Sequence, residues 1–203
     1  MTDAEYSELD ALINTNDRLT ERECGLLIHH AGDFLTNGVA RSITTCNLED
    51  RNYYGSSDLV VVAEMRSDTS KDELNVFIWE LKAPQCFLME KDQNNNRYRP
   101  TKDFAKAENQ LIHYLDYARN DSNFRIRHQI VDPSNIQAGG IVIGRFPDRI
   151  TAGTSDAERD RALKSLQIRK NLFYSPQGIR IVTWDRILQQ TPLWVDPVTK
   201  KQP

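Results

Sequence analysis

The sequence of 203 residues lacks several features that common classes of protein require. Its three cysteines form no CxxC pair and have no finger-like spacing with histidine, which excludes the standard zinc modules and a disulfide framework. No stretch approaches the roughly 20 apolar residues that cross a bilayer, and the acidic N-terminus is unlike a signal peptide. We therefore expect a cytoplasmic protein with no membrane partner.

The signatures of several enzyme classes are also absent. The four histidines have neither HExxH nor HxH spacing, so a histidine-zinc hydrolase has little support. No GxSxG elbow, P-loop or GxGxxG motif occurs, which removes the usual serine hydrolases, nucleotide hydrolases and dinucleotide-binding enzymes. The aromatic residues Trp79, Tyr114 and Trp184 lie in apolar patterns, so we expect them in the core.

What is present is typical of one globular domain, with 39% hydrophobic and 27% charged residues. The net charge of −3 predicts no overall attraction to nucleic acid, but charge is unevenly distributed. Residues 1–23 carry seven acids and two bases, whereas residues 145–170 carry seven bases and four acids. The basic segment is compatible both with a solvated helix face containing salt pairs and with a surface that faces phosphates.

Apolar periodicity predicts the order of the elements. Thr20 followed by Glu23 matches a capping box and predicts a helix that ends at Asn37-Gly38. The order α, β, β, β, α, β, α, β predicts an α/β protein of the α+β type, with a mixed sheet and helices on both faces. The expected elements are a helix at 21–36, strands at 39–47, 59–64 and 75–82, a loop at 93–101, a helix at 102–119, a strand at 141–144, a helix at 156–172, a strand at 179–183 and a short segment at 184–188.

The same pattern predicts a simple domain organisation. We expect an acidic N-terminal segment at 1–19, in which residues 4–13 form a short helix. One domain follows at 20–190, and a tail occupies 191–203. Gly139-Gly140 resembles a phosphate loop only superficially and fits a close-packed entry to a strand better.

Two acids and a lysine are expected to meet at the ends of two strands. Glu80 and Lys82 project from the same strand face because strand side chains alternate. A hairpin turn centred near Ser70 places Asp58 opposite Lys82 and diagonal to Glu80. Carboxylates of this kind can hold Mg²⁺, and a lysine can act on a water that attacks a phosphodiester. A surface salt cluster is the alternative interpretation.

Two predicted helices carry further candidates for this site. Gln110 lies on the flank of the helix at 102–119, from which it can lean toward the strand ends. Glu21 and Glu23 lie in the first turn of the helix at 21–36, and either can reach a metal-bound water. Plain helix capping by Glu23 is the alternative.

The order of these motifs resembles the PD-(D/E)xK nuclease superfamily: Asp58, then FIWELKAP, then AENQL with Tyr114. More narrowly, ELKAP, AENQLIHY, GGIVIGR and IRIVTWDRIL resemble the nuclease domain of Shedu antiphage-defence proteins over about residues 21–189. The resemblance implies a restriction-endonuclease-like fold and a Mg²⁺-dependent DNA endonuclease in bacterial antiphage defence. It also implies that Mn²⁺ can substitute, that DNA is the partner, and that the chain forms homo-oligomers, commonly tetramers.

The resemblance assigns metal ligands residue by residue. Asp58 and Glu80 would bind the metal, with the Leu81 carbonyl as a further ligand and Glu23 as the acid of the first helix. Ser57 stands before Asp58 where many members of the superfamily have proline, and this departure removes no ligand.

The remaining roles concern water and DNA. By resemblance, Lys82 would act on the nucleophilic water, and Gln110 would position that water or the phosphate. From their positions in basic segments, the expected nucleic-acid contacts are Arg145, Arg97, Tyr98, Arg159 and Arg169. Two alternatives remain, namely a nucleic-acid-binding or sensing module that does not cut, and a protein-interaction domain that uses the helix at 156–170.

Overall fold

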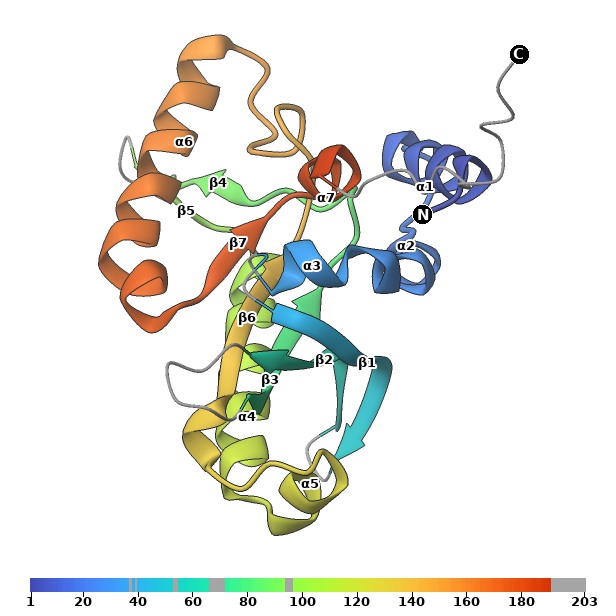
Figure 1. Cartoon of the computed structure of the whole chain (residues 1–203). Coiled ribbons are helices and arrows are strands. Elements are labelled where there is room, and N and C mark those ends of the chain that lie inside the picture. The colour runs from blue at the N-terminus through green and yellow to red at the C-terminus, as the bar shows by residue number, and fades with distance from the viewer. Residues whose placement is uncertain (37, 39, 53–54, 66–71, 94–96, 191–203) are drawn as a thin grey trace, which may run out of the picture.

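The computed structural model describes residues 1–36, 38, 40–52, 55–65, 72–93 and 97–190. Its centre is a mixed five-stranded sheet of order β1-β2-β3-β6-β7 (Figure 1). The first three strands are antiparallel, and β6 and β7 continue the sheet parallel to β3. The strands are β1 Ala40–Asn52, β2 Gly55–Met65, β3 Glu73–Leu81, β6 Ile136–Val142 and β7 Arg180–Val182. The predicted mixed sheet with flanking helices is confirmed.

Helices cover both faces of the sheet. One face packs against α4 Lys102–Asn120, α5 Ser122–Arg127 and α6 Asp156–Arg169. The opposite face packs against α1 Asp3–Asn14, α2 Glu21–Leu27, α3 Gly32–Leu35 and α7 Trp184–Gln190. Between β3 and α4, a separate two-stranded sheet is formed by β4 Met89–Lys91 and β5 Tyr98–Pro100. Shorter turns of helix occur at Ile28–Ala31, Pro133–Asn135, Lys170–Tyr174 and Ser175–Gln177.

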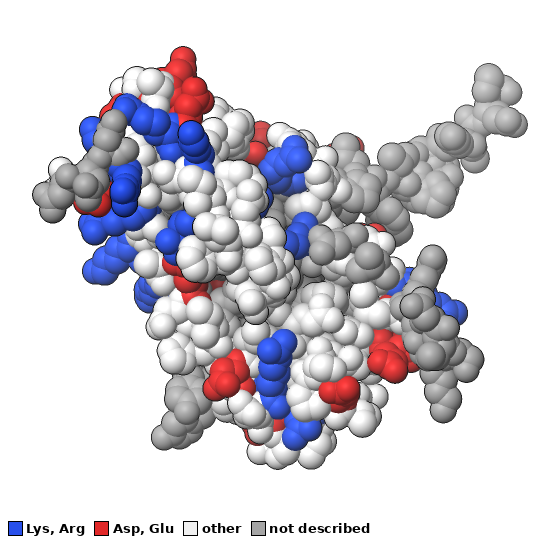
Figure 2. All heavy atoms as spheres, turned by 90° about the vertical axis from the view of Figure 1, so that its left-hand side faces the viewer, with Lys and Arg blue, Asp and Glu red and all other residues white. Residues whose placement is uncertain are grey.

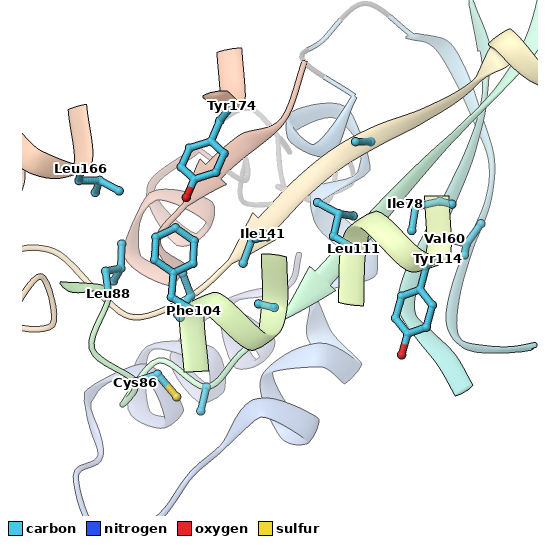
Figure 3. Close-up of a cluster of buried hydrophobic side chains, with 14 of the residues drawn as sticks. Val60, Ile78, Cys86, Leu88, Phe104, Leu111, Tyr114, Ile141, Leu166 and Tyr174 are labelled. Atoms are coloured by element: carbon cyan, nitrogen blue, oxygen red, sulfur yellow. The ribbon is translucent and has the colours of Figure 1, made fainter. Parts of the chain in front are cut away.

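Alternation along β2 and β3 divides the core in two. Val60 and Ile78 face α4, whereas their neighbours Leu59 and Trp79 face α2 and α7. Phe104 and the other apolar residues of α4 lie against the first of these faces (Figure 3). Glu80 is the next residue of β3 on the same face as Ile78. Helix α4 therefore covers this acid as well.

The helix predicted at 102–119 is confirmed as α4. Its buried stripe consists of Phe104, Ala107, Leu111, Tyr114 and Ala118, which recur at helical spacing. The side chain of Thr101 accepts a hydrogen bond from the amide of Phe104 and begins the helix.

The helix predicted at 21–36 is not continuous. It divides into α2, a turn of 3₁₀ helix at Ile28–Ala31 and α3. Gly25 and Gly32 lie within it, and a Cβ added at Gly32 would stand 3.0 Å from Ile43 of β1. The close approach of Ile43 favours glycine at this position, and glycine weakens a helix. Thr20 makes no side-chain cap either, since its hydroxyl donates to the carbonyl of Leu12 at 3.1 Å.

Other predicted boundaries also changed. Part of the loop predicted at 93–101 is β5, which pairs with β4, and the helix predicted at 156–172 continues past α6 as the π-helical turn Lys170–Tyr174. The turn expected near Ser70 and the tail at 191–203 lie outside the described residues. None of the helices in the described part of the chain combines the length and apolarity that crossing a bilayer requires.

Candidate functional site

The side chains of Asp58, Glu80 and Lys82 lie together at the adjoining ends of β2 and β3. Leu59 pairs with Trp79 in this antiparallel ladder, so the next pair outward sets Asp58 level with Glu80. The predicted register, with Asp58 opposite Lys82, is wrong by two residues. Because strand faces repeat every two residues, this shift leaves all three side chains on the same face.

The lysine amine joins the two acids. Lys82 Nζ donates to Glu80 Oε1 at 2.6 Å and to the Leu81 carbonyl at 2.7 Å, and it lies 3.8 Å from Asp58 Oδ2. Asp58 Oδ2 also accepts a hydrogen bond of 2.9 Å from the Leu81 amide. The side chain of Glu80 is fully buried, whereas that of Asp58 is 26% exposed. Solvent and ligands therefore reach the cluster from the side of Asp58.

Burial gives the cluster unusual proton affinities. It raises the pKa of Glu80 to about 8, the negative charge of Asp58 adds to this effect, and Lys82 only partly offsets it. Burial acts to lower the pKa of Lys82. The negative charge of Glu80 and its hydrogen bond with Lys82 act in the opposite direction and are the main reasons why the pKa of Lys82 is raised. Glu80 Oε2 is buried and receives no hydrogen bond from a donor among the described residues, although the Glu80 and Asp58 carboxyls can share a proton. One acidic oxygen is thus left available for a cation.

Gln110 and Tyr114 of α4 border the cluster. Gln110 Nε2 lies 3.5 Å from the hydroxyl of Tyr114, and Gln110 Oε1 is buried without a partner in the described structure. Burial raises the pKa of Tyr114, and the charges of Glu80 and Asp58 raise it further. The prediction that Tyr114 lies in the core is confirmed for its ring (Figure 3), but the sequence did not predict that the side chain also lies within electrostatic reach of Glu80 and Asp58. The four-residue spacing from Gln110 was the available signal.

The acid of α2 that lies at the site is Glu21, not Glu23. Glu23 forms an ion pair of 2.7 Å with Arg18, away from the cluster. Glu21 is half-buried and lines a pocket of about 310 Å³ with Asp58 and Leu81. Burial raises the pKa of Glu21, and its two strongest charge interactions are with Lys82, which lowers that pKa, and Asp58, which raises it. The placement of Glu23 at the metal site is therefore corrected.

A buried tryptophan fixes the end of β3. Trp184 Nε1 donates to the Lys82 carbonyl at 2.7 Å, and the Lys82 amide donates to the Val142 carbonyl at 2.8 Å. Trp184 is fully buried, as the sequence pattern predicted. The main chain that carries Lys82 is therefore held on two sides.

Two of the expected nucleic-acid contacts are unavailable for that role. Arg145 is 9% exposed and donates to the Ile13 carbonyl at 2.8 Å and to Asn16 Oδ1 at 3.1 Å, so it holds the C-terminal end of α1. Tyr98 is 7% exposed and packs in the core beneath α4. Both predictions are wrong, because tertiary packing buries side chains that the local sequence left free. Arg97 is exposed, as expected.

Two of the three arginines of α6 form ion pairs within the protein. Arg159 lies 3.3 Å from Asp156, one turn earlier. Arg169 donates to Glu108 at 3.0 Å and to the hydroxyl of Tyr174 at 3.1 Å. These ion pairs favour the interpretation of the segment as a helix face with salt pairs.

The residues of the cluster fit a hard divalent cation. Mg²⁺ prefers oxygen ligands and commonly takes only one or two carboxylates, with waters and substrate completing its shell. The unpartnered Glu80 Oε2, the exposed part of Asp58 and the Leu81 carbonyl supply oxygens of this type. Within the described residues, no three His, Cys, Asp or Glu side chains are grouped as a metal-binding set.

A divalent cation should stabilise the protein more at higher pH. Because burial raises the pKa of Glu80 from 4.5 to about 8, the folded chain holds a proton that the unfolded chain releases, and the free energy of unfolding falls as pH rises between these values. A cation needs the deprotonated carboxylate, so the rise in melting temperature on adding Mn²⁺ should grow between about pH 6 and pH 9. Thermal melts of the wild type and Glu80→Gln check this, and an equal pH dependence in both would contradict it.

A mixed sheet covered by helices, with acids and a lysine at adjacent strand ends, is the α+β architecture of a nuclease-like core. The family model for the C-terminal region of the Shedu protein SduA matches residues 18–188. Since this match spans most of the chain, the protein belongs to the Shedu SduA C-terminal family. The resemblance seen in the sequence is confirmed, and the family indicates antiphage defence and a nuclease role. A search of curated proteins found no match.

Proposed function

We propose that the protein is a Mg²⁺-dependent endonuclease of the PD-(D/E)xK class that hydrolyses DNA phosphodiester bonds in bacterial antiphage defence. The observation that carries this proposal is the cluster at the ends of β2 and β3, where Lys82 Nζ lies 2.6 Å from Glu80 and 3.8 Å from Asp58. Two carboxylates and an amine in one cluster match what metal-assisted phosphodiester hydrolysis needs. Family membership supports the same conclusion.

Each residue has a role that follows from its surroundings. Asp58, Glu80 and the Leu81 carbonyl would hold Mg²⁺ or Mn²⁺, which supplies charge neutralisation and an acidified water when bound. Lys82 keeps a positive charge at the cluster and can stabilise negative charge that develops on the phosphate. Gln110 can accept a hydrogen bond from a water through Oε1, which has no partner among the described residues, and can thereby orient that water.

The partners and setting of the protein belong to the same proposal. DNA is the proposed substrate, and the proposed form is a cytoplasmic homo-oligomer, a tetramer by resemblance to the family. The resemblance to Shedu proteins supports these assignments, and the match over residues 18–188 strengthens that resemblance.

Plasmid cleavage tests the proposal. Purified protein with supercoiled plasmid should produce nicked DNA in Mg²⁺ or Mn²⁺, and EDTA should abolish the reaction. Lys82→Ala should lower the rate by about 10²-fold or more, because it removes the amine that supports the phosphate. Lys164→Ala, at an exposed position of α6, is the matched control and should keep the wild-type rate. Cleavage without metal, or undiminished cleavage by Lys82→Ala, would refute the assignment.

A further inference from the structure

Two cations border the acid cluster from opposite faces of the sheet. Arg22 belongs to α2, which packs on the face that contains Trp79 and Leu81. Lys106 belongs to α4, which packs on the face that contains Ile78. Both side chains belong to exposed residues. The cluster therefore lies between two positive charges.

Arg22 opens into the site pocket. It lines the cavity of about 310 Å³ together with Glu21, Asp58 and Leu81. Its neighbour in α2, Glu23, is already neutralised by Arg18 at 2.7 Å. No ion pair involving Arg22 is found in the described part of the chain. Its guanidinium is thus available to an incoming anion.

Lys106 of α4 is the second cation, on the face of the sheet opposite to Arg22. It precedes Gln110 by four residues, so the two side chains lie one above the other on the same helix face. Its charge lowers the pKa of Glu21, which shows that it lies within electrostatic reach of the site. It forms no ion pair with any described residue. A second positive charge without an ion pair in the described residues therefore lies near the acids, on the side of α4.

The basic side chains near α6 are more numerous, but several of them already form ion pairs. Basic residues gather on the face formed by α6 and the β4-β5 sheet (Figure 2). Several of these are paired within the protein: Arg159 with Asp156, Arg169 with Glu108 and Arg99 with Glu90. A phosphate would have to displace these carboxylates, which reduces the gain from releasing DNA counterions.

We infer that Arg22 and Lys106 bind the backbone phosphates on either side of the phosphate that is cut. The nucleic-acid strand then crosses the sheet edge from α2 to α4, over Asp58, and the α6 face is not its main docking surface. This inference rests on the proposed function, which it deepens by locating the substrate. The contact is with phosphates, so it carries no sequence preference.

The test measures binding apart from cleavage. The full chain carrying Glu80→Gln is titrated in Mg²⁺ against a fluorescein-labelled DNA duplex, and anisotropy gives the affinity at several salt concentrations. Adding Arg22→Ala or Lys106→Ala should weaken binding about threefold to tenfold and reduce the slope of log affinity against log salt by about 1 each. The matched controls Arg159→Ala and Lys164→Ala should stay within about twofold of the parent.

The possible results distinguish the loss of a charge from misfolding of the variant, and they distinguish DNA binding from DNA cleavage. Arg22→Lys and Lys106→Arg should restore most of the affinity, which a merely unfolded alanine variant would not explain. Unchanged binding in both alanine variants, a greater loss in the α6 controls, or no DNA binding at all would overturn the inference. The expected losses without plasmid cleavage by the wild type would overturn the proposed function alone. Plasmid cleavage without those losses would overturn the inference alone.

Discussion

Glu80→Gln should lower DNA cleavage by about 10³-fold while the protein stays folded. The substitution keeps the shape of a side chain that is 0% exposed, and an amide oxygen can still accept the hydrogen bond from Lys82. What it removes is the negative charge, including that of Oε2, the oxygen without a partner in the described structure. The nearly isosteric change therefore isolates cation binding from packing. Initial rates of plasmid nicking in Mg²⁺ give the comparison.

The control for this variant is a glutamate of similar chemistry outside the site. Glu90 lies in β4, its side chain is 43% exposed, and it pairs with Arg99 at 2.8 Å. Glu90→Gln should leave the rate of nicking unchanged, because an exposed ion pair contributes little to stability and nothing to the pocket. Circular dichroism of both variants should match the wild type. If Glu80→Gln kept more than about a tenth of the wild-type rate, a ligand role for Glu80 would be untenable.

Gly140→Ala should destabilise the fold by about 3 to 5 kcal/mol or prevent folding. A Cβ at this position would stand 2.1 Å from the carbonyl oxygen of Arg180, on the neighbouring strand β7. Gly140 also has a φ of +151°, which residues with a side chain rarely adopt. Since the contact is with main chain, no rotamer change can relieve it, and β6 and β7 would have to separate. Urea unfolding followed by circular dichroism measures the loss.

Gly178→Ala is the matched control for this change. Gly178 also has a positive φ, of +70°, but a Cβ there would meet nothing within 4 Å. We expect a cost of about 1 kcal/mol, from backbone strain alone. Similar losses in the two variants would show that strain, and not the approach of β7, dominates at Gly140.

The grouping of Asp58, Glu80 and Lys82 could be predicted because it depends only on which face of its strand each side chain occupies. Alternation along a strand puts Glu80 and Lys82 on one face whatever the rest of the fold does. Asp58 joined them despite a register error of two residues, since only an odd shift would have moved it to the other face. The α4 stripe was predictable for a similar reason, because five buried residues repeat at helical spacing.

The choice between Glu21 and Glu23 could not be made from the sequence. Both stand in the first turn of α2, and the rotation of that helix depends on how Gly25 packs against Leu81 and Leu48. These are tertiary contacts between segments far apart in the chain. A local pattern that marks the start of a helix contains no information about them.

Arg145 and Tyr98 show the same limit for surface predictions. Arg145 follows a buried strand and resembled a free basic residue, but its guanidinium donates to the Ile13 carbonyl of α1 and to the amide oxygen of Asn16, just after that helix. Tyr98 lies in a polar stretch, yet the pairing of β5 with β4 turns its ring into the core. In both cases the burying partner comes from a distant or unrecognised element, so composition alone suggested exposure.

The hydrogen bond from Trp184 to the Lys82 carbonyl joins residues 102 positions apart. During translation, the strand that carries Glu80 and Lys82 leaves the ribosome long before β6, β7 and Trp184 are available to support it. A nascent chain therefore acquires a well-ordered end of β3 only after Trp184 has left the ribosome. Incomplete products released earlier would carry both residues yet lack the support that positions them.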